Sequence, residues 1–114
     1  MSKSRTILPA EAIVLDTLIE APEQGIASRV LAKTTGGNVT LFGFDAGQEL
    51  SEHTAPFDAL VLVLTGAVSL TIGGVPVRAT PGTIVRMPAD VPHAVEATEP
   101  SRMLLIMLRE PVRQ

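Results

Sequence analysis

Residues 47–66 read GQELSEHTAPFDALVLVLTG, and residues 82–93 read GTIVRMPADVPH. The predicted fold and the predicted site both depend on these two stretches. Each stretch begins with a glycine and carries one of the two histidines of the sequence, His53 and His93. Because the only two imidazoles close such similar glycine-to-histidine segments, we expect their rings to face one another inside the fold. The sequence predicts a histidine pair close enough to share one ion or one water.

Short apolar segments separated by glycine and proline run along the whole chain. The 114 residues suit a single domain, with residues 26–109 as a barrel and residues 1–25 as an arm and covering segment. Hydrophobic residues make up 46% of the chain and aromatic residues 3%, so we expect an aliphatic core. Turn residues are spread evenly, and Gly73 with Gly74 gives the clearest hairpin signal. The pattern predicts an all-β, antiparallel barrel of about eight or nine strands.

Composition argues against several classes of partner. The net charge is −3 and the nine basic residues form no cluster, which is not typical of a nucleic-acid-binding protein. The absence of cysteine excludes disulfides and zinc–thiolate sites, so any metal must be held by imidazole and oxygen. The apolar runs are far shorter than the ~20 residues that span a bilayer, and the start MSKSRT leads into no signal-like segment. We expect a soluble, cytoplasmic protein with no nucleic-acid or membrane partner.

The two stretches resemble the two sequence motifs of the cupins. In the first motif a glycine precedes His-x-His by five residues, and a glutamate and a closing glycine follow; this sequence matches it at Gly47, His53 and Gly66. The second motif runs from a glycine through Pro-x-Gly and a histidine to an asparagine; this sequence matches it at Gly82, Pro88 and His93. The resemblance covers residues 26–109. It implies a small RmlC-like cupin with a double-stranded β-helix, or jelly-roll, barrel.

The sequence departs from these motifs at four positions. Typical cupins bind metal with three histidines and one glutamate, and here only His53 and His93 remain. The second histidine of the first motif, its glutamate, the second glycine of the second motif and its asparagine fall respectively on Ala55, Ala59, Asp90 and Ala97. The metal-binding motifs are therefore degenerate.

A third ligand would have to come from outside the motifs, because transition-metal sites usually take three or four protein ligands. The candidates are Glu49, Glu52 and Asp58. In a regular strand Glu49 lies on the same side as His53, whereas Glu52 faces the other way. Asp58 could turn inward only through a bulge or an altered turn. For all three carboxylates, a solvated position in a turn or at the rim is the favoured interpretation.

Two functions are compatible with these residues. In the first, His53 and His93 weakly hold a divalent ion such as zinc, nickel, manganese or iron, and a small molecule binds beside it. In the second, the protein is a metal-free, non-catalytic module that binds a small molecule by hydrogen bonds. No catalytic residue can be assigned, and enzyme activity stays open. The expected pocket is lined by His53, Ala55, Ala59, Val61, Met87, His93 and Val95.

The outside of the barrel gives a further expectation. If the motif register holds, Ala59, Val61 and Val63 face inward and Leu60, Leu62 and Leu64 point outward. Residues 103–108 read MLLIML, and either register leaves three large side chains outside. Residues 9–20 could form a short helix or a strand, since their period does not decide between the two, and could cover part of this surface. A second subunit is the better cover, so we expect a homodimer.

Overall fold

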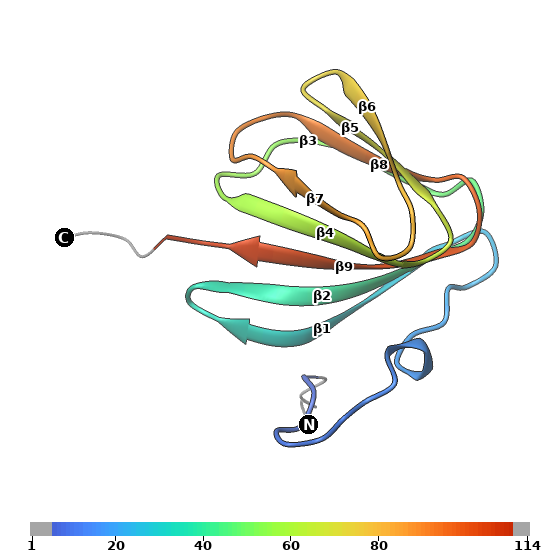
Figure 1. The fold of residues 1–114 in the computed structure, drawn as a ribbon, viewed down its shortest axis with the longest axis vertical. Helices are drawn as coiled ribbons and strands as arrows, with labels where there is room; N and C mark the ends of the chain where they lie inside the picture. The colour runs from blue at the N-terminus through green and yellow to red at the C-terminus, as the bar shows by residue number, and fades with distance from the viewer. Residues whose placement is uncertain (1–5, 111–114) are drawn as a thin grey trace.

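Two antiparallel sheets packed face to face make up the fold of residues 6–110, which the computed structural model describes. One sheet has the order β1-β2-β9-β4-β7 and the other the order β3-β8-β5-β6 (Figure 1). The expected all-β jelly-roll, or double-stranded β-helix, is confirmed. The strands are β1 (Ile26–Thr34), β2 (Gly37–Phe44), β3 (Glu49–His53), β4 (Asp58–Thr65), β5 (Val68–Ile72), β6 (Val75–Ala79), β7 (Ile84–Met87), β8 (His93–Ala97) and β9 (Ser101–Leu108).

Alternation along β4 fixes which residues fill the space between the sheets. Ala59, Val61 and Val63 are at most 4% exposed and belong to the main core, as the motif register predicts. The opposite sheet contributes buried aliphatic side chains from β5, β6 and β8 to the same core. Because interior packing is dense, these side chains fix the distance between the two sheets. The buried members besides those of β4 are Phe44, Val68, Leu70, Ala79, Met87, Val95, Ala97 and Met103.

A second, smaller core lies on the outer face of the five-stranded sheet. It is formed where the amino-terminal segment crosses below β1 and β2 (Figure 1), and its buried members are Ile19, Leu31 and Leu41. Leu64 and Leu104, from the outward faces of β4 and β9, pack against it. The segment therefore covers part of the outer apolar surface, as expected for residues 9–20 from the sequence.

The covering segment itself has little regular structure. Within residues 9–20 the only helix is η1 (Leu15–Thr17), a single 3-10 turn in which the Thr17 hydroxyl donates to the Val14 carbonyl at 2.7 Å. Nearby, the Ile7 N–H donates to the Leu31 carbonyl at 2.8 Å and so ties the segment to the edge strand β1. Tertiary contact, rather than helical or strand periodicity, holds this segment in place.

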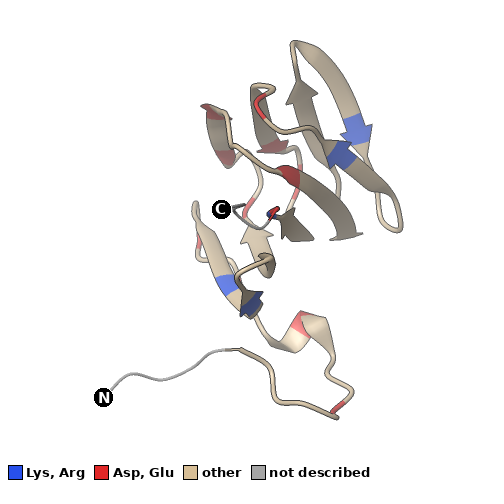
Figure 2. Cartoon of the chain, turned by 90° about the vertical axis from the view of Figure 1, so that its left-hand side faces the viewer, with Lys and Arg blue, Asp and Glu red and all other residues tan. Residues whose placement is uncertain are grey.

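The charged side chains are distributed over many elements. Figure 2 looks at the end of the barrel where β9 finishes, and it shows acidic and basic residues on several strands and loops rather than in one patch. Within residues 6–110, no helix has the length and apolar character needed to cross a membrane.

The β4–β5 connection depends on a glycine. Gly66 has φ +78°, and a Cβ at this position would overlap the Pro100 carbonyl oxygen and the Ser101 hydroxyl. The Ser101 Oγ is part of the connection, because it accepts the Ala67 N–H at 3.1 Å. Gly47 has a similar φ of +81°, but a Cβ there would meet nothing within 4 Å.

These two glycines give a matched test of the connection. We expect Gly47→Ala to lower the free energy of unfolding by about 1–2 kcal/mol, which is the cost of left-handed backbone in alanine. Gly66→Ala should cost at least about 2 kcal/mol more, because it adds a clash with backbone atoms to the same strain. Urea denaturation of both variants measures the difference, and equal losses would contradict this account of Gly66.

Candidate functional site

The two histidines meet at the mouth of the barrel. β3 ends at His53, β8 begins at His93, and the two residues are direct cross-strand partners. Their Nε2 atoms are 3.1 Å apart, and the rings meet edge to face with centroids 4.4 Å apart. The predicted pair is thus confirmed. His93 is buried at 5% exposure, whereas His53 is exposed, so the site has an inner and an outer member.

The β7–β8 loop holds His93 in position through backbone hydrogen bonds. Asp90 adopts a left-handed conformation with φ 64°, and its N–H donates to the Ala55 carbonyl of the β3–β4 loop at 2.8 Å. The Gly73 N–H from the β5–β6 turn donates to the Pro92 carbonyl at 2.8 Å. Connections from both sheets therefore converge next to the histidine pair.

Hydrogen bonds at the far side of each ring determine where the protons lie. Nδ1 of His53 is 2.8 Å from the Ser51 carbonyl oxygen, and Nδ1 of His93 is 3.1 Å from the Val91 carbonyl oxygen. A carbonyl only accepts, so each Nδ1 must carry the hydrogen. When both rings are neutral, each has this single N–H and both Nε2 atoms present lone pairs; when one ring is protonated, its Nε2–H donates to the other Nε2. Two lone pairs at 3.1 Å repel unless a proton or a metal cation lies between or beside them.

This geometry fits two ligands of one metal ion. Metal–imidazole bonds are ~2.1 Å long, and two such bonds at a right angle place their nitrogens about 3.0 Å apart. The observed separation of 3.1 Å agrees with this arrangement. The Nδ1–carbonyl contacts are also the kind of second interaction that fixes the tautomer and orientation of a ligating histidine.

Glu49 lies on the wrong side of β3 to join the pair, contrary to the expectation from strand alternation. The pairing of β3 with β8 contains a bulge between Leu50 and His53, so one extra residue separates them. Leu50 packs against the main core, which leaves Glu49 on the outer face of the sheet. There Glu49 pairs with Glu96, and it lines a shallow depression together with Glu52 and Ser69.

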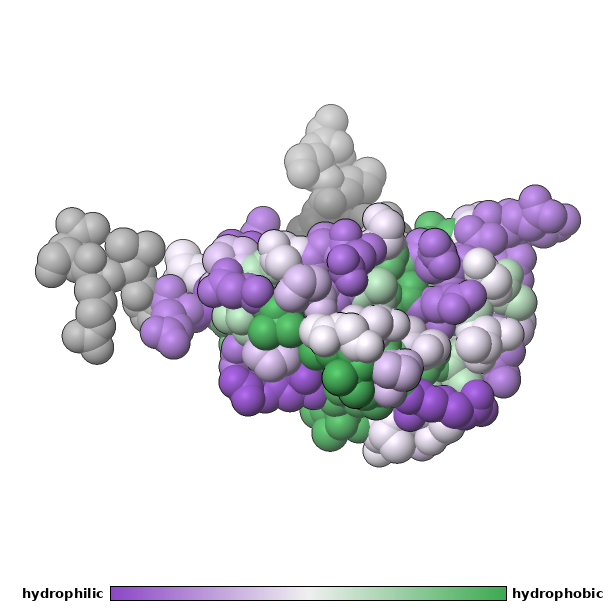
Figure 3. Space-filling view, turned by 90° about the horizontal axis from the view of Figure 1, so that it is seen from above, coloured by the Kyte–Doolittle hydropathy of each residue, from purple (hydrophilic) through white to green (hydrophobic). Residues whose placement is uncertain are grey.

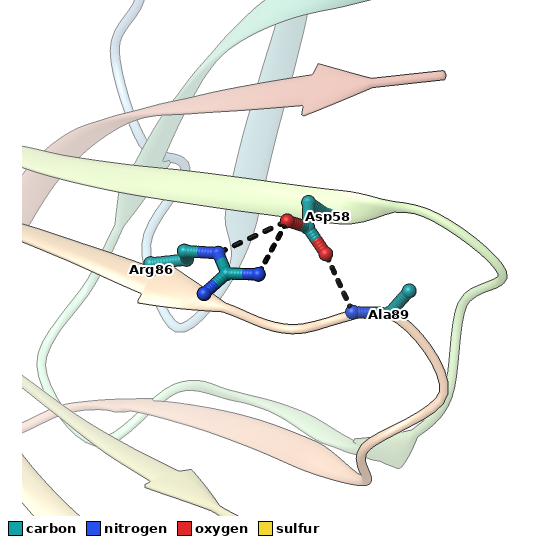
Figure 4. Close-up of polar contacts among 3 residues, drawn as sticks. All are labelled: Asp58, Arg86 and Ala89. Atoms are coloured by element: carbon teal, nitrogen blue, oxygen red, sulfur yellow. Dashed lines mark hydrogen bonds and ion pairs between the residues drawn. The ribbon is translucent and has the colours of Figure 1, made fainter. Parts of the chain in front are cut away.

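Asp58 is also not free to serve as a third ligand. Its carboxylate accepts hydrogen bonds from Arg86 Nε at 3.0 Å, Arg86 Nη2 at 2.8 Å and the Ala89 N–H at 2.9 Å (Figure 4). The Ala89 hydrogen bond, followed by the bond from Arg86, lowers the pKa of Asp58 below its ordinary value. Asp58 therefore joins β4 to β7 and its loop. Within residues 6–110, no group of three or more His, Cys, Asp or Glu side chains is placed to hold a metal ion.

The other residues expected to line a pocket differ in their surroundings. Ala55 is half-buried in the β3–β4 loop, where its carbonyl accepts the Asp90 N–H. The remaining four are buried members of the main core and form part of its packing: Ala59, Val61, Met87 and Val95. A ligand pocket lined by this set stays a prediction.

A groove that the sequence analysis missed lies near the ends of β4, β7 and β9. It has a volume of about 900 Å³, and the Arg109 guanidinium stacks over the Phe57 ring there, 5.1 Å from its centroid. No sequence motif indicated this contact, because Phe57 lies in the loop before β4 and Arg109 follows the end of β9, and the two meet only in the folded chain. The groove is lined by Pro56, Phe57, Asp58, Arg86, Ala89, Leu108, Arg109 and Glu110.

Comparison with known proteins agrees with the fold and the motifs. The family model for the cupin domain matches residues 40–108. A conserved protein of unknown function from Streptococcus pyogenes is 32% identical, with 98% of each chain covered and a TM-score of 0.88. A cupin superfamily protein from Desulfitobacterium hafniense is 28% identical over 96% of this chain and 100% of its own, with a TM-score of 0.86. The chain belongs to the cupin family.

A third similar structure is longer than this chain. It is a cupin 2 conserved barrel domain protein from Leptotrichia buccalis, 37% identical over 82% of this chain and 46% of its own, with a TM-score of 0.79. No curated protein shows a match. The similar proteins above thus support the small, RmlC-like cupin architecture, and none of their descriptions names a substrate.

The Asp58 contacts predict a pH dependence of stability. A carboxyl whose pKa is lowered in the folded state stabilises the protein above its unfolded pKa of about 4, and this contribution is lost as pH falls through the lowered folded pKa. We expect the thermal midpoint of the wild type to fall more steeply below about pH 5 than that of Asp58→Asn. The pKa of Asp45 is also lowered, chiefly by the hydrogen bond from the Gln24 N–H. Part of the dependence of the thermal midpoint on pH therefore remains in both proteins.

The control is Asp16→Asn, which changes an exposed aspartate on η1. Thermal unfolding followed by circular dichroism between pH 3 and 7 measures all three proteins. A profile for Asp58→Asn that runs parallel to the wild type would show that this carboxylate does not couple protonation to folding.

Proposed function

We propose that His53 and His93 together bind one divalent metal ion weakly, and that the remaining coordination positions take water or an oxygen group of a small molecule. The observation that supports the proposal is the convergence of the two Nε2 atoms at 3.1 Å, with the Nδ1 of each ring against a backbone carbonyl. Zinc, nickel, manganese and iron all accept imidazole, so the donor set leaves the choice among them open. Membership of the cupin family, whose typical motifs hold metal, adds to this support.

The two rings have different parts in this proposal. His93 is buried and held by the Val91 carbonyl, and its loop is fastened to Ala55, so it supplies a fixed ligand. His53 is exposed at the rim, where a ligand entering from solvent can reach the ion beside it. A bound divalent ion would polarise a ligand oxygen or a coordinated water. With alanine at positions 55 and 59, the site would stay open and its affinity low.

The second candidate is a metal-free module that binds a small molecule at the same pair. It is favoured by the lack, among residues 6–110, of a third acidic or imidazole group near the two rings. In this case a donor group of the ligand, rather than a metal, would lie beside the two Nε2 atoms and hydrogen-bond to them. Both candidates are binding functions, and neither includes a catalysed reaction.

Metal titration of the purified protein distinguishes the two candidates. We expect isothermal titration with zinc, nickel or manganese to give one ion per chain with a Kd above about 1 µM, equivalent to a binding free energy weaker than about −8 kcal/mol. His53→Ala and His93→Ala should each weaken uptake at least about tenfold, because either change leaves one imidazole. Glu49→Gln is the matched control and should bind like the wild type, because Glu49 faces the other side of β3.

Three results would change this assignment. No uptake of any of these ions favours the metal-free module. Uptake that survives both histidine substitutions places the ion elsewhere on the protein. A Kd in the nanomolar range would mean that further ligands complete the site.

A further inference from the structure

The groove at the ends of β4, β7 and β9 contains an arginine that is held in place but has no acidic partner. The pairing of β4 with β9 ends where Asp58 lies opposite Leu108, and the next residue on each side, Phe57 and Arg109, meet beyond it. The Arg109 N–H donates to the Gly36 carbonyl at 2.7 Å, so the backbone is fixed there. Within residues 6–110, the guanidinium of Arg109 has no hydrogen-bond acceptor and no ion-pair partner.

Stacking on Phe57 orients the Arg109 guanidinium without using its N–H groups. The guanidinium carbon lies 5.1 Å from the centroid of the half-buried Phe57 ring, which therefore contacts the face of the cation. The five N–H donors lie at the edge, in a fork that matches two oxygens of a carboxylate or a phosphate. Because the side chain is oriented before a ligand arrives, less conformational entropy is lost on binding. Arg109 is thus prepared to hold an oxyanion.

The other charged residues of the groove differ in how far they are compensated. Both oxygens of Asp58 are engaged, by Arg86 and by the Ala89 N–H (Figure 4). Arg86 makes these contacts through Nε and Nη2, so its Nη1 edge remains available on a side chain that is 63% exposed. Glu110 is exposed at the border of the groove, and its charge opposes an anion there. The charges balance, so recognition must depend on direct hydrogen bonds.

The size and the apolar walls of the groove favour an organic ligand. Its volume of about 900 Å³ lies within the range of small-molecule sites and exceeds what a single inorganic ion fills. Pro56, Ala89 and Leu108 provide apolar surface beside the two arginines. A ligand that combines an acidic group with an apolar part matches both kinds of lining.

The depression on the four-stranded sheet has the opposite character. It is lined by Glu49, Glu52 and Glu96 and by no basic residue. An anion would be repelled there. The contrast indicates that the arginines of the groove, rather than the charge of the whole chain, would select such a ligand.

We propose that this groove binds a small organic anion, whose carboxylate or phosphate group accepts hydrogen bonds from Arg109, with Arg86 as the second cation, and whose apolar part packs against Pro56 and Leu108. The site does not use the histidine pair and needs no metal. Its walls include the β3–β4 and β7–β8 loops, which the hydrogen bond from the Asp90 N–H to the Ala55 carbonyl joins beside the histidines. A ligand in the groove would therefore contact both loops that flank the histidine pair.

Nuclear magnetic resonance titration of the ¹⁵N-labelled protein in EDTA tests the site without metal. Benzoate and phenyl phosphate are the probes, and benzamide is the uncharged control ligand. We expect both anions to shift the amide signals of Phe57, Asp58, Ala89 and Arg109 with a Kd of about 1 mM or lower. Benzamide should bind at least about fivefold more weakly, because it lacks the charge that strengthens the hydrogen bonds. The anion with the lower Kd identifies the preferred acidic group.

A matched pair of variants tests the role of Arg109. Arg109→Gln should raise the Kd of the better probe at least about fivefold, because it removes the charged fork. Arg78→Gln removes the same charge from an exposed position on β6, on the side of the barrel where hydrophilic and apolar residues are mixed (Figure 3), and should leave the Kd unchanged. Glu110→Gln should lower the Kd about twofold, because it removes the opposing charge.

The amide spectrum of each variant verifies its fold, and Arg109→Lys, which keeps the charge but loses the fork, is the second change if Arg109→Gln does not fold; it should also raise the Kd. The absence of shifts with either anion at about 10 mM would overturn the proposal. Equal binding of benzamide, or an equal loss of affinity in Arg78→Gln, would also overturn it, because Arg109 would then not recognise the acidic group. Shifts confined to His53 and His93 would place the anion at the histidine pair instead.

Discussion

Burial of side chains between the two sheets is the constraint on which the other features of this barrel depend. Val61 and Val63 from β4 and Met103 from β9 are fully buried against aliphatic side chains of the opposite sheet. Leu50 of β3 packs against the same core and Val95 of β8 belongs to it, so the core also positions the two strands that carry the histidines. The histidine pair owes its geometry to this core, although neither imidazole contributes apolar packing to it.

The sequence predicted the parts of the structure that follow from local pattern. Strand alternation and the glycine-to-histidine spacing were sufficient for the inward face of β4 and for the meeting of His53 with His93, because both depend on regular register. The face of the sheet on which Glu49 lies could not be predicted, because a bulge in β3 reverses the alternation. No residue pattern within 50–53 indicates this bulge. The fixed position of Asp58 was equally hidden, because its partner Arg86 lies on another strand. The path of residues 9–20 follows tertiary contacts that leave no period in the sequence.

Main-chain contacts give the histidine pair its defined geometry. The backbone carbonyl of Ala55 fastens the β7–β8 loop by accepting the Asp90 N–H. The carbonyls of Ser51 and Val91 orient the two rings. Since these orienting contacts all come from main-chain carbonyls, they do not depend on which side chains occupy positions 51, 55 and 91.

Because of the bulge, the length of β3 at the barrel opening can change without a change in the packing of the interior. Leu50 is anchored in the core and His53 is paired with His93, while Ser51 and Glu52 span the interval with one residue more than the partner strand has. Removing one of these two residues would restore regular pairing while the inward positions on either side stayed in place. The strand can thus lose a residue at the opening without a shift in the register of Leu50 or His53, so the width of the entrance can change while the packing of the hydrophobic interior stays the same.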